Sequence, residues 1–173
     1  MLNQLINVFW TLASFMAVGS YWGVHFAEKR SPSVLGAIIV VSVLCYMTPR
    51  RWLSALTLSE NRRTYERIGV KFMLWFVQNG TFVNRIQRKF SKEKAIITSR
   101  KKASTYLSTI DMQERYHYCC FVFFILSAIS ALLIGKTESA FFIMLWNILY
   151  NVYPILLQQY NRLRINSVLS VKS

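Results

Sequence analysis

The arrangement of uncharged stretches constrains the fold of this chain more than any other feature. Four long stretches contain no Asp, Glu, Lys or Arg, namely residues 1–27, 31–49, 116–135 and 139–161. An α-helix needs about 20 apolar residues to cross the hydrocarbon core of a bilayer, and each stretch is close to that length. A soluble domain would interrupt such stretches with polar residues at helical spacing. The sequence therefore predicts an all-α membrane protein with about four transmembrane helices.

The predicted spans divide a single membrane domain of 173 residues into four helices and one large loop. We place the spans at about 4–26, 33–49, 116–135 and 139–160, with residues 50–115 as the loop. The second stretch is the shortest, which fits either a short span or a tilted helix packed on its neighbours. Only a Gly-Lys-Thr-Glu turn separates the third and fourth spans. A turn this short makes consecutive helices antiparallel neighbours.

The basic residues are concentrated between the second and third spans. The net charge is +14, and residues 50–115 hold fifteen Lys and Arg against five Asp and Glu. If all four stretches cross the membrane, this loop and both termini lie on the same side. The positive-inside rule then places that side in the cytoplasm. We therefore expect a multi-pass protein of the cytoplasmic (inner) membrane, with cytoplasmic N- and C-termini.

The basic loop also contains one short apolar segment. Residues 72–77 (Phe-Met-Leu-Trp-Phe-Val) are too few to cross a membrane, and Lys71 and Arg85 flank them. This pattern is typical of an interfacial amphipathic helix. Anionic lipid headgroups are the expected partners, because each nearby Lys or Arg contributes about 1 kcal/mol of attraction. We expect no nucleic-acid partner, since the sequence has no recognition fold or aromatic platform; a homo-oligomer is left open.

Polar residues at the third and fourth spans form two groups at the same membrane depth. Glu114 and His117 are three residues apart at the head of the third span, so they share a helix face. The fourth span carries a stripe at steps of three and four residues, made of Asn147, Asn151, Pro154, Gln158, and Asn161 or Arg162, with Tyr160 and Arg164 beside it. Because the third span starts on the side where the fourth ends, the two groups meet in one polar cleft.

This cleft has two interpretations. In the first, His117 is a general base oriented by Glu114, and nearby amides and guanidinium groups hold an oxyanion or a phosphate. In the second, the polar residues form interhelical hydrogen bonds that hold two spans together. We expect no metal, because a di-iron site needs a second Glu-x-x-His on a partner helix. The only other histidine, His25, falls at the opposite membrane face.

The C-terminal part of the fourth span carries a sequence signature. Residues 151–164 (Asn-Val-Tyr-Pro-Ile-Leu-Leu-Gln-Gln-Tyr-Asn-Arg-Leu-Arg) resemble the pattern N-x-x-P-x-x-x-Q-R-Y-N-R-x-R. That pattern is the signature of the glycosyl-4,4'-diaponeurosporenoate acyltransferase family of small bacterial membrane proteins. Gln159 stands where the signature has its first arginine.

Two further segments extend the resemblance to this family. The Glu114-x-x-His117 pair resembles the family's acidic residue and histidine, and residues 65–71 are similar to its Y-E-x-x-G-[IV]-K segment. Together the matches cover about residues 61–165 in the same order. The resemblance implies an enzyme that places a fatty acyl chain on a lipid-borne sugar hydroxyl in carotenoid biosynthesis.

These observations lead to one enzymatic hypothesis and one rival. In the enzyme, His117 and Glu114 are catalytic, and the substrate-binding residues are Asn147, Asn151, Gln158, Tyr160, Asn161, Arg162 and Arg164. We expect no bound cofactor, a lipid acceptor, and acyl-CoA or an acyl carrier protein as the co-substrate. The rival is a non-catalytic membrane protein that acts in interaction, immunity or scaffolding. In the rival, the amide stripe only joins helices.

Overall fold

The computed structural model describes residues 2–76 and 100–170, and these residues form helices and turns with no strand among them. The described elements are α1 (Leu2–Ala27), α2 (Ser33–Tyr46), α3 (Arg50–Ala55), α4 (Arg62–Arg67), α5 (Val70–Phe76), α7 (Arg100–Leu133), α8 (Thr137–Asn147), the π-helical turn η1 (Ile148–Val152) and α9 (Tyr153–Ser170). The predicted all-helical fold is therefore confirmed.

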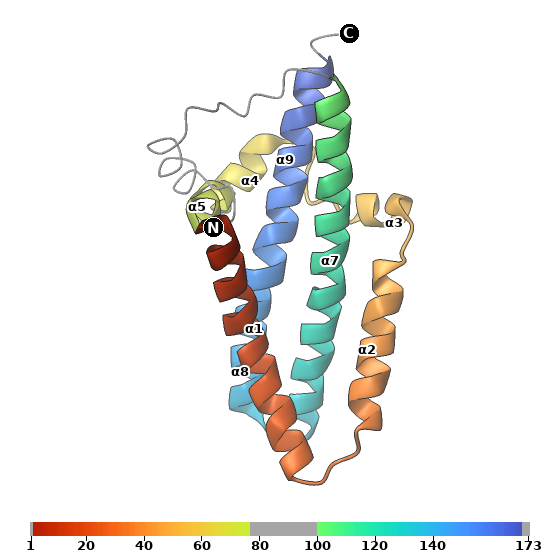
Figure 1. Cartoon of the computed structure of the whole chain (residues 1–173), viewed down its shortest axis with the longest axis vertical. Helices are drawn as coiled ribbons and strands as arrows, with labels where there is room; N and C mark the ends of the chain where they lie inside the picture. The colour runs from red at the N-terminus through yellow and green to blue at the C-terminus, as the bar shows by residue number, and fades with distance from the viewer. Residues whose placement is uncertain (1, 77–99, 171–173) are drawn as a thin grey trace.

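The long helices run side by side along the longest axis of the molecule (Figure 1). Among the described residues, three segments are long and apolar enough to cross a membrane: Gln4–Ala27, Ala103–Leu133 and Thr137–Ser167. The fourth apolar helix, α2, has 14 residues, so it is about 21 Å long against a hydrocarbon core of about 30 Å. It packs along α7 as a shorter fourth helix of the bundle.

The outside of the bundle is apolar, as expected for a protein that contacts lipid. Leu12 and Met16 on α1, Leu44 on α2 and Phe141 on α8 are each at least 60% exposed. A soluble monomer rarely exposes so much apolar surface. The distribution of side chains therefore supports association with a membrane.

Small residues allow the helices to approach one another closely. Ala128 and Ala131 of α7 and Ala140 of α8 are buried in the main core cluster, together with Phe124 and Ile143. Small side chains at helix contacts are typical of membrane bundles, where close packing replaces the hydrophobic effect as the source of stability.

The predicted hairpin is formed by α7 and α8. Gly135 has a positive φ of 77°, which a glycine adopts without steric penalty. Its N–H donates to the carbonyl of Leu132, and the N–H of Lys136 donates to the carbonyl of Ala131 at 2.9 Å. This is the Schellman pattern of helix termination, and it returns the chain antiparallel to α7.

Helix α7 begins earlier than the sequence pattern indicates. We expected a loop up to residue 115, whereas α7 starts at Arg100 and continues without interruption to Leu133. Its first turns are polar outside, but Ala103 and Ile110 are buried against Ile165 of α9. This narrow apolar contact extends the helix beyond the uncharged stretch. Residues 77–99 of the predicted loop lie outside the described residues.

The short helices α3, α4 and α5 lie in the half of the molecule in which α9 ends, with α4 and α5 on one side of α7 and α3 on the other (Figure 1). The α1–α2 and α7–α8 connections lie at the opposite end. The predicted apolar segment of the loop forms α5, apart from its last residue, which lies outside the described part of the chain. Val70 and Met73 of α5 are buried, whereas Phe72 is 67% exposed. The start of α1 lies beside this helix, and both border the candidate site.

Candidate functional site

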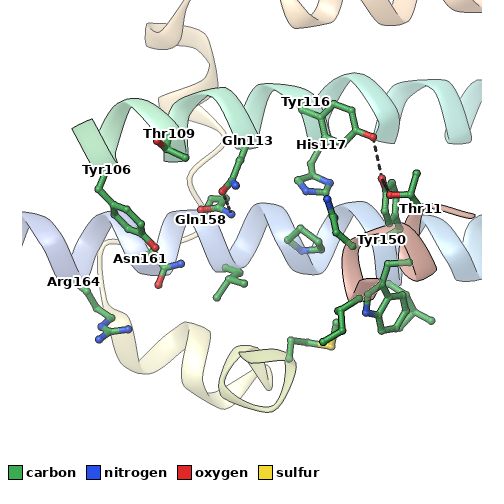
Figure 2. Close-up of a pocket in the computed structure, with 17 residues that line it drawn as sticks. Thr11, Tyr106, Thr109, Gln113, Tyr116, His117, Tyr150, Gln158, Asn161 and Arg164 are labelled. Atoms are coloured by element: carbon green, nitrogen blue, oxygen red, sulfur yellow. Dashed lines mark hydrogen bonds between the residues drawn. The ribbon is translucent and has the colours of Figure 1, made fainter. Parts of the chain in front are cut away.

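An elongated cavity of about 370 Å³ lies between α1, α5, α7 and the helix formed by η1 and α9. Figure 2 shows that His117, Tyr150 and Thr11 lie at one end and that Tyr106 and Arg164 lie at the other. Most of the labelled side chains are polar, although the surrounding bundle is apolar. A polar cavity within an apolar bundle is where a membrane protein binds hydrophilic parts of a substrate.

His117 is held at one end of the cavity by a chain of amides. Its Nδ1 lies 3.4 Å from Oδ1 of Asn151, whose Nδ2 donates to Oδ1 of Asn147 at 2.8 Å. Nδ2 of Asn147 donates in turn to the backbone carbonyl of Phe121 at 3.3 Å. Because a carbonyl only accepts, this bond fixes both amides and makes Oδ1 of Asn151 the acceptor of Nδ1–H. The lone pair of neutral His117 is then on Nε2, which becomes the basic nitrogen.

The helix that faces His117, formed by α8, η1 and α9, is irregular next to the histidine. In the π-helical turn at residues 148–152, the N–H of Tyr153 bonds to the carbonyl five residues back. The carbonyl of Leu149 therefore loses its usual i+4 donor, and the carbonyl of Tyr150 loses its own because Pro154 has no N–H. The histidine interacts with the backbone of Tyr150. The irregularity thus adds backbone polarity at this end of the cavity.

Three hydroxyl groups cluster beside His117. The Tyr150 hydroxyl lies 2.9 Å from that of Tyr116 and 3.1 Å from that of Thr11 (Figure 2). The Tyr150 ring packs edge-on against the imidazole, with 5.6 Å between ring centroids. Hydroxyl groups both donate and accept hydrogen bonds. The cluster can therefore bind oxygen atoms of a substrate next to the basic nitrogen.

A pair of amides bridges the two helices at the middle of the cavity. Nε2 of Gln158 donates to Oε1 of Gln113 at 2.8 Å. The sequence prediction assigned no site role to Gln113, nor to Thr11 and Tyr116 at the histidine end. A signal was present in α7, where polar residues recur at helical spacing in the order Tyr106, Thr109, Gln113 and His117. All four line the cavity, so a second polar stripe faces the predicted one.

Glu114 and Arg162 line a second, smaller cavity of about 80 Å³. Glu114 is 2% exposed and forms an ion pair with Arg162, which also pairs with Asp111 at 2.8 Å. The structure thus differs from the expectation that Glu114 orients His117. A buried carboxylate without a cation is strongly unfavourable, so the carboxyl group turns to the arginine of α9. Asn151 takes the place that we expected Glu114 to have.

Gln159 lies at the centre of another buried network. Its Oε1 accepts from the N–H of Leu58 at 3.1 Å and from the hydroxyl of Tyr65 at 3.0 Å. Its Nε2 donates to the carbonyl of Leu56 at 3.3 Å and to Glu114 at 3.4 Å. An arginine, which the family signature has here, offers no acceptor for the first two donors. The glutamine therefore fastens the segment before α4 to the bundle.

The structure brings together some of the predicted site residues and separates others. The predicted residues that line the cavity are His117, Gln158, Asn161 and Arg164. Asn147 and Asn151 are fully buried, and their bonds to each other and to His117 make them supports of the histidine. Tyr160 is also buried, and its hydroxyl donates to Glu66 at 3.2 Å. It supports the Arg164 end of the cavity.

Comparison with known proteins identifies the relationship of the chain. Searches of curated proteins and of solved structures gave no significant match. The sequence profile of the family described as glycosyl-4,4'-diaponeurosporenoate acyltransferase matches residues 49–171. The match includes α3 to α9 and every predicted site residue, whereas α1 and its contribution to the cavity lie outside it. Because the profile matches more than half of the chain, this protein belongs to the glycosyl-4,4'-diaponeurosporenoate acyltransferase family.

Proposed function

We propose that this protein transfers a fatty acyl group to a hydroxyl of a lipid-linked sugar, such as a carotenoid glycoside, at the cytoplasmic leaflet. The family supplies the reaction class. The observation that carries the proposal is the amide relay from Asn151 to His117 beside the cavity. A histidine with a fixed tautomer is suited to remove a proton from a hydroxyl nucleophile.

In the proposed reaction, Nε2 of His117 takes the proton of the acceptor hydroxyl while the hydroxyl oxygen attacks the acyl carbonyl carbon of an ester or thioester donor. A C–O bond forms, and the carbonyl π electrons move onto oxygen to give a tetrahedral oxyanion. The hydroxyls of Tyr116, Tyr150 and Thr11 lie where they can donate to developing negative charge. The bond between the acyl carbon and the leaving group then breaks, and the imidazolium gives its proton to the leaving group. The products are a sugar ester and a protonated leaving group, and His117 is neutral again.

The charge distribution supports the cytoplasmic side as the place of reaction. Arg62 and Arg67 lie on α4, which packs against α9 near the Arg164 end of the cavity. Basic residues that flank spans are enriched on the cytoplasmic side, and they attract anionic lipids there. This arrangement puts both the acyl donor and the headgroup of the lipid acceptor within reach of the cavity.

The test is turnover by the His117→Ala variant. Purified protein in proteoliposomes is given an acyl thioester and a lipid-linked glycoside, and the ester is measured by mass spectrometry. We expect the rate to fall about 10²- to 10⁴-fold, which is the usual contribution of a general base. His25→Ala removes the other histidine, which bonds to the carbonyl of Ser31 outside the cavity, and it serves as the matched control. A wild-type rate in His117→Ala would refute the catalytic role.

A non-catalytic scaffold is the second candidate, because the bonds between Asn147, Asn151 and Phe121 join two helices. Under this reading, the lipid profile of cells does not depend on the gene. Replacing Asn151 would then lower thermal stability and nothing else. Loss of one acylated glycolipid upon deletion of the gene contradicts the scaffold.

A further inference from the structure

Two arginines flank one aromatic ring at the end of the cavity away from His117. The guanidinium carbon of Arg164 lies 5.8 Å from the centroid of the Tyr160 ring, and that of Arg62 lies 5.6 Å from it. The ring attracts each cation and holds both in place. One positive group from α9 and one from α4 thus contact the same ring.

Among the described residues, the acidic side chains nearby form no ion pair with Arg164. Arg162, two positions from Arg164, is already paired with Asp111 and Glu114. Glu66 pairs with Lys71 at 2.9 Å and attracts Arg62 over a longer distance. Within residues 2–76 and 100–170, Arg164 has no ion pair with an acidic side chain. An arginine with open donors beside a second arginine is a favourable site for a phosphate.

The distance from this pair to the histidine limits the ligand. Asn151, which holds His117, and Arg164 are separated by about 20 Å of helix. The chain between the phosphate and the sulfur of phosphopantetheine contains two amides and extends to about 16 Å, as a peptide of similar length does. The phosphopantetheine chain is shorter than the distance along the helix, and the long side chain of Arg164 spans part of the remaining gap.

The middle of the cavity, between His117 and Arg164, has side chains that suit phosphopantetheine. Gln113, Gln158 and Asn161 line the middle of the cavity (Figure 2). Side-chain amides both donate and accept, so they can pair with the two amides of a pantetheine arm. Met73 and Leu157 supply apolar wall between them, which suits the methylene groups.

We propose that Arg164, with Arg62 beside it, binds the phosphate of a phosphopantetheine thioester, and that this thioester is the acyl donor. The inference rests on the proposed acyl transfer. The arm lies along α9 and brings the thioester carbonyl to His117. The acyl C–S bond breaks when the ester forms, and the sulfur leaves as a thiol with the proton returned by His117. Acyl-CoA and an acyl carrier protein present the same phosphate and arm.

The experiment compares donors with and without the phosphate. Initial rates are measured in proteoliposomes with acyl-CoA, an acyl carrier protein thioester, and acyl-pantetheine, which has no phosphate. We expect Arg164→Ala to lower kcat/KM for acyl-CoA about 10- to 100-fold, as expected for a lost charge-assisted hydrogen bond. The rate with acyl-pantetheine should not change. Arg63→Ala is the matched control, because Arg63 is an exposed arginine of α4 that does not line the cavity.

The possible outcomes separate this inference from the proposed function. If Arg164→Ala lowers the rates with all three donors equally, or with none, the phosphate site is refuted. If His117→Ala is inactive in the same assays, the proposed acyl transfer is supported and only the phosphate site is rejected. Activity of the wild-type protein with a phospholipid donor and with none of the thioesters would also refute the inference. A preference between acyl-CoA and the carrier-protein thioester identifies the carrier.

Discussion

At the scale of single residues, a neutral amide orients the histidine of this cavity. Asn151 accepts a hydrogen bond from the imidazole but contributes no negative charge, so it favours one tautomer without strongly favouring the imidazolium ion. Glu114, three residues before the histidine, is bound to Arg162 instead. Spacing along a helix shows which residues share a face, but it does not show which of two partners a carboxylate prefers. The pairing follows from the position of Arg162 on the neighbouring helix.

Asn151→Ala is the prediction at this scale. The variant loses the acceptor for Nδ1–H, so a smaller fraction of His117 has its lone pair on Nε2. We expect kcat to fall about 10- to 100-fold, the usual loss when a supporting hydrogen bond to a functional histidine is removed. KM should stay within about twofold, because Asn151 is buried and does not line the cavity. Steady-state kinetics in proteoliposomes check this.

Asn161→Ala is the contrasting variant, because Asn161 lines the middle of the cavity. It should raise KM more than it lowers kcat. If Asn151→Ala changed KM alone, then Asn151 would bind substrate and would not position the histidine.

At the scale of elements, the sequence predicts some helices well and others poorly. The α7–α8 hairpin is predictable, since only three residues separate two uncharged stretches and the first stretch ends in glycine. The start of α7 is not predictable from charge, because residues 100–115 are held as helix by a narrow contact with α9. The π-helical turn is also invisible in the pattern, although Pro154 indicates that one carbonyl lacks its donor. Contacts between helices decide these features.

Gly135→Ala is the prediction at the scale of elements. Gly135 has φ of 77°, and a Cβ there would meet nothing within 4 Å. The penalty is therefore conformational, and we expect the free energy of unfolding to fall by about 1 kcal/mol. Gly36→Ala is the control, because this helical glycine also has open space around it. It should be neutral or slightly stabilising. Equal effects of the two changes on thermal unfolding in detergent would contradict this account of the turn.

At the scale of the whole molecule, the charges at the two ends differ. The end that holds the α1–α2 and α7–α8 connections carries Glu28, Arg30 and Lys136. The carboxylate of Glu28 forms ion pairs with both Arg30 and Lys136. The other end carries the basic short helices and the two arginines that flank Tyr160. The pKa of Glu28 is lowered by its hydrogen bonds to Lys136 and Arg30. One end is therefore nearly balanced in charge, and the other is strongly basic.

The topology prediction follows from this difference. We expect the ends of α1 and α9 that lie near the basic helices to face the cytoplasm. A green fluorescent protein fused to the C-terminus should be fluorescent, and alkaline phosphatase at the same place should be inactive. The same phosphatase inserted in the α1–α2 connection should be active, because α1 crosses the membrane before this connection. Activity of the C-terminal phosphatase fusion would reverse the assigned orientation.

The π-helical turn and Pro154 together have a consequence for how an acceptor lipid must enter. They deprive the carbonyl of Leu149 of its helical donor, whereas the backbone of Tyr150 already interacts with His117. An aliphatic tail lying against the Leu149 carbonyl oxygen would leave that oxygen dehydrated, whereas a sugar ring brings several hydroxyl donors to it. We therefore expect the glycosyl head to bind deepest, with the isoprenoid and acyl tails directed outwards between the helices into lipid. The irregular helix would then orient the lipid before the reaction, because it favours the sugar over the apolar tails.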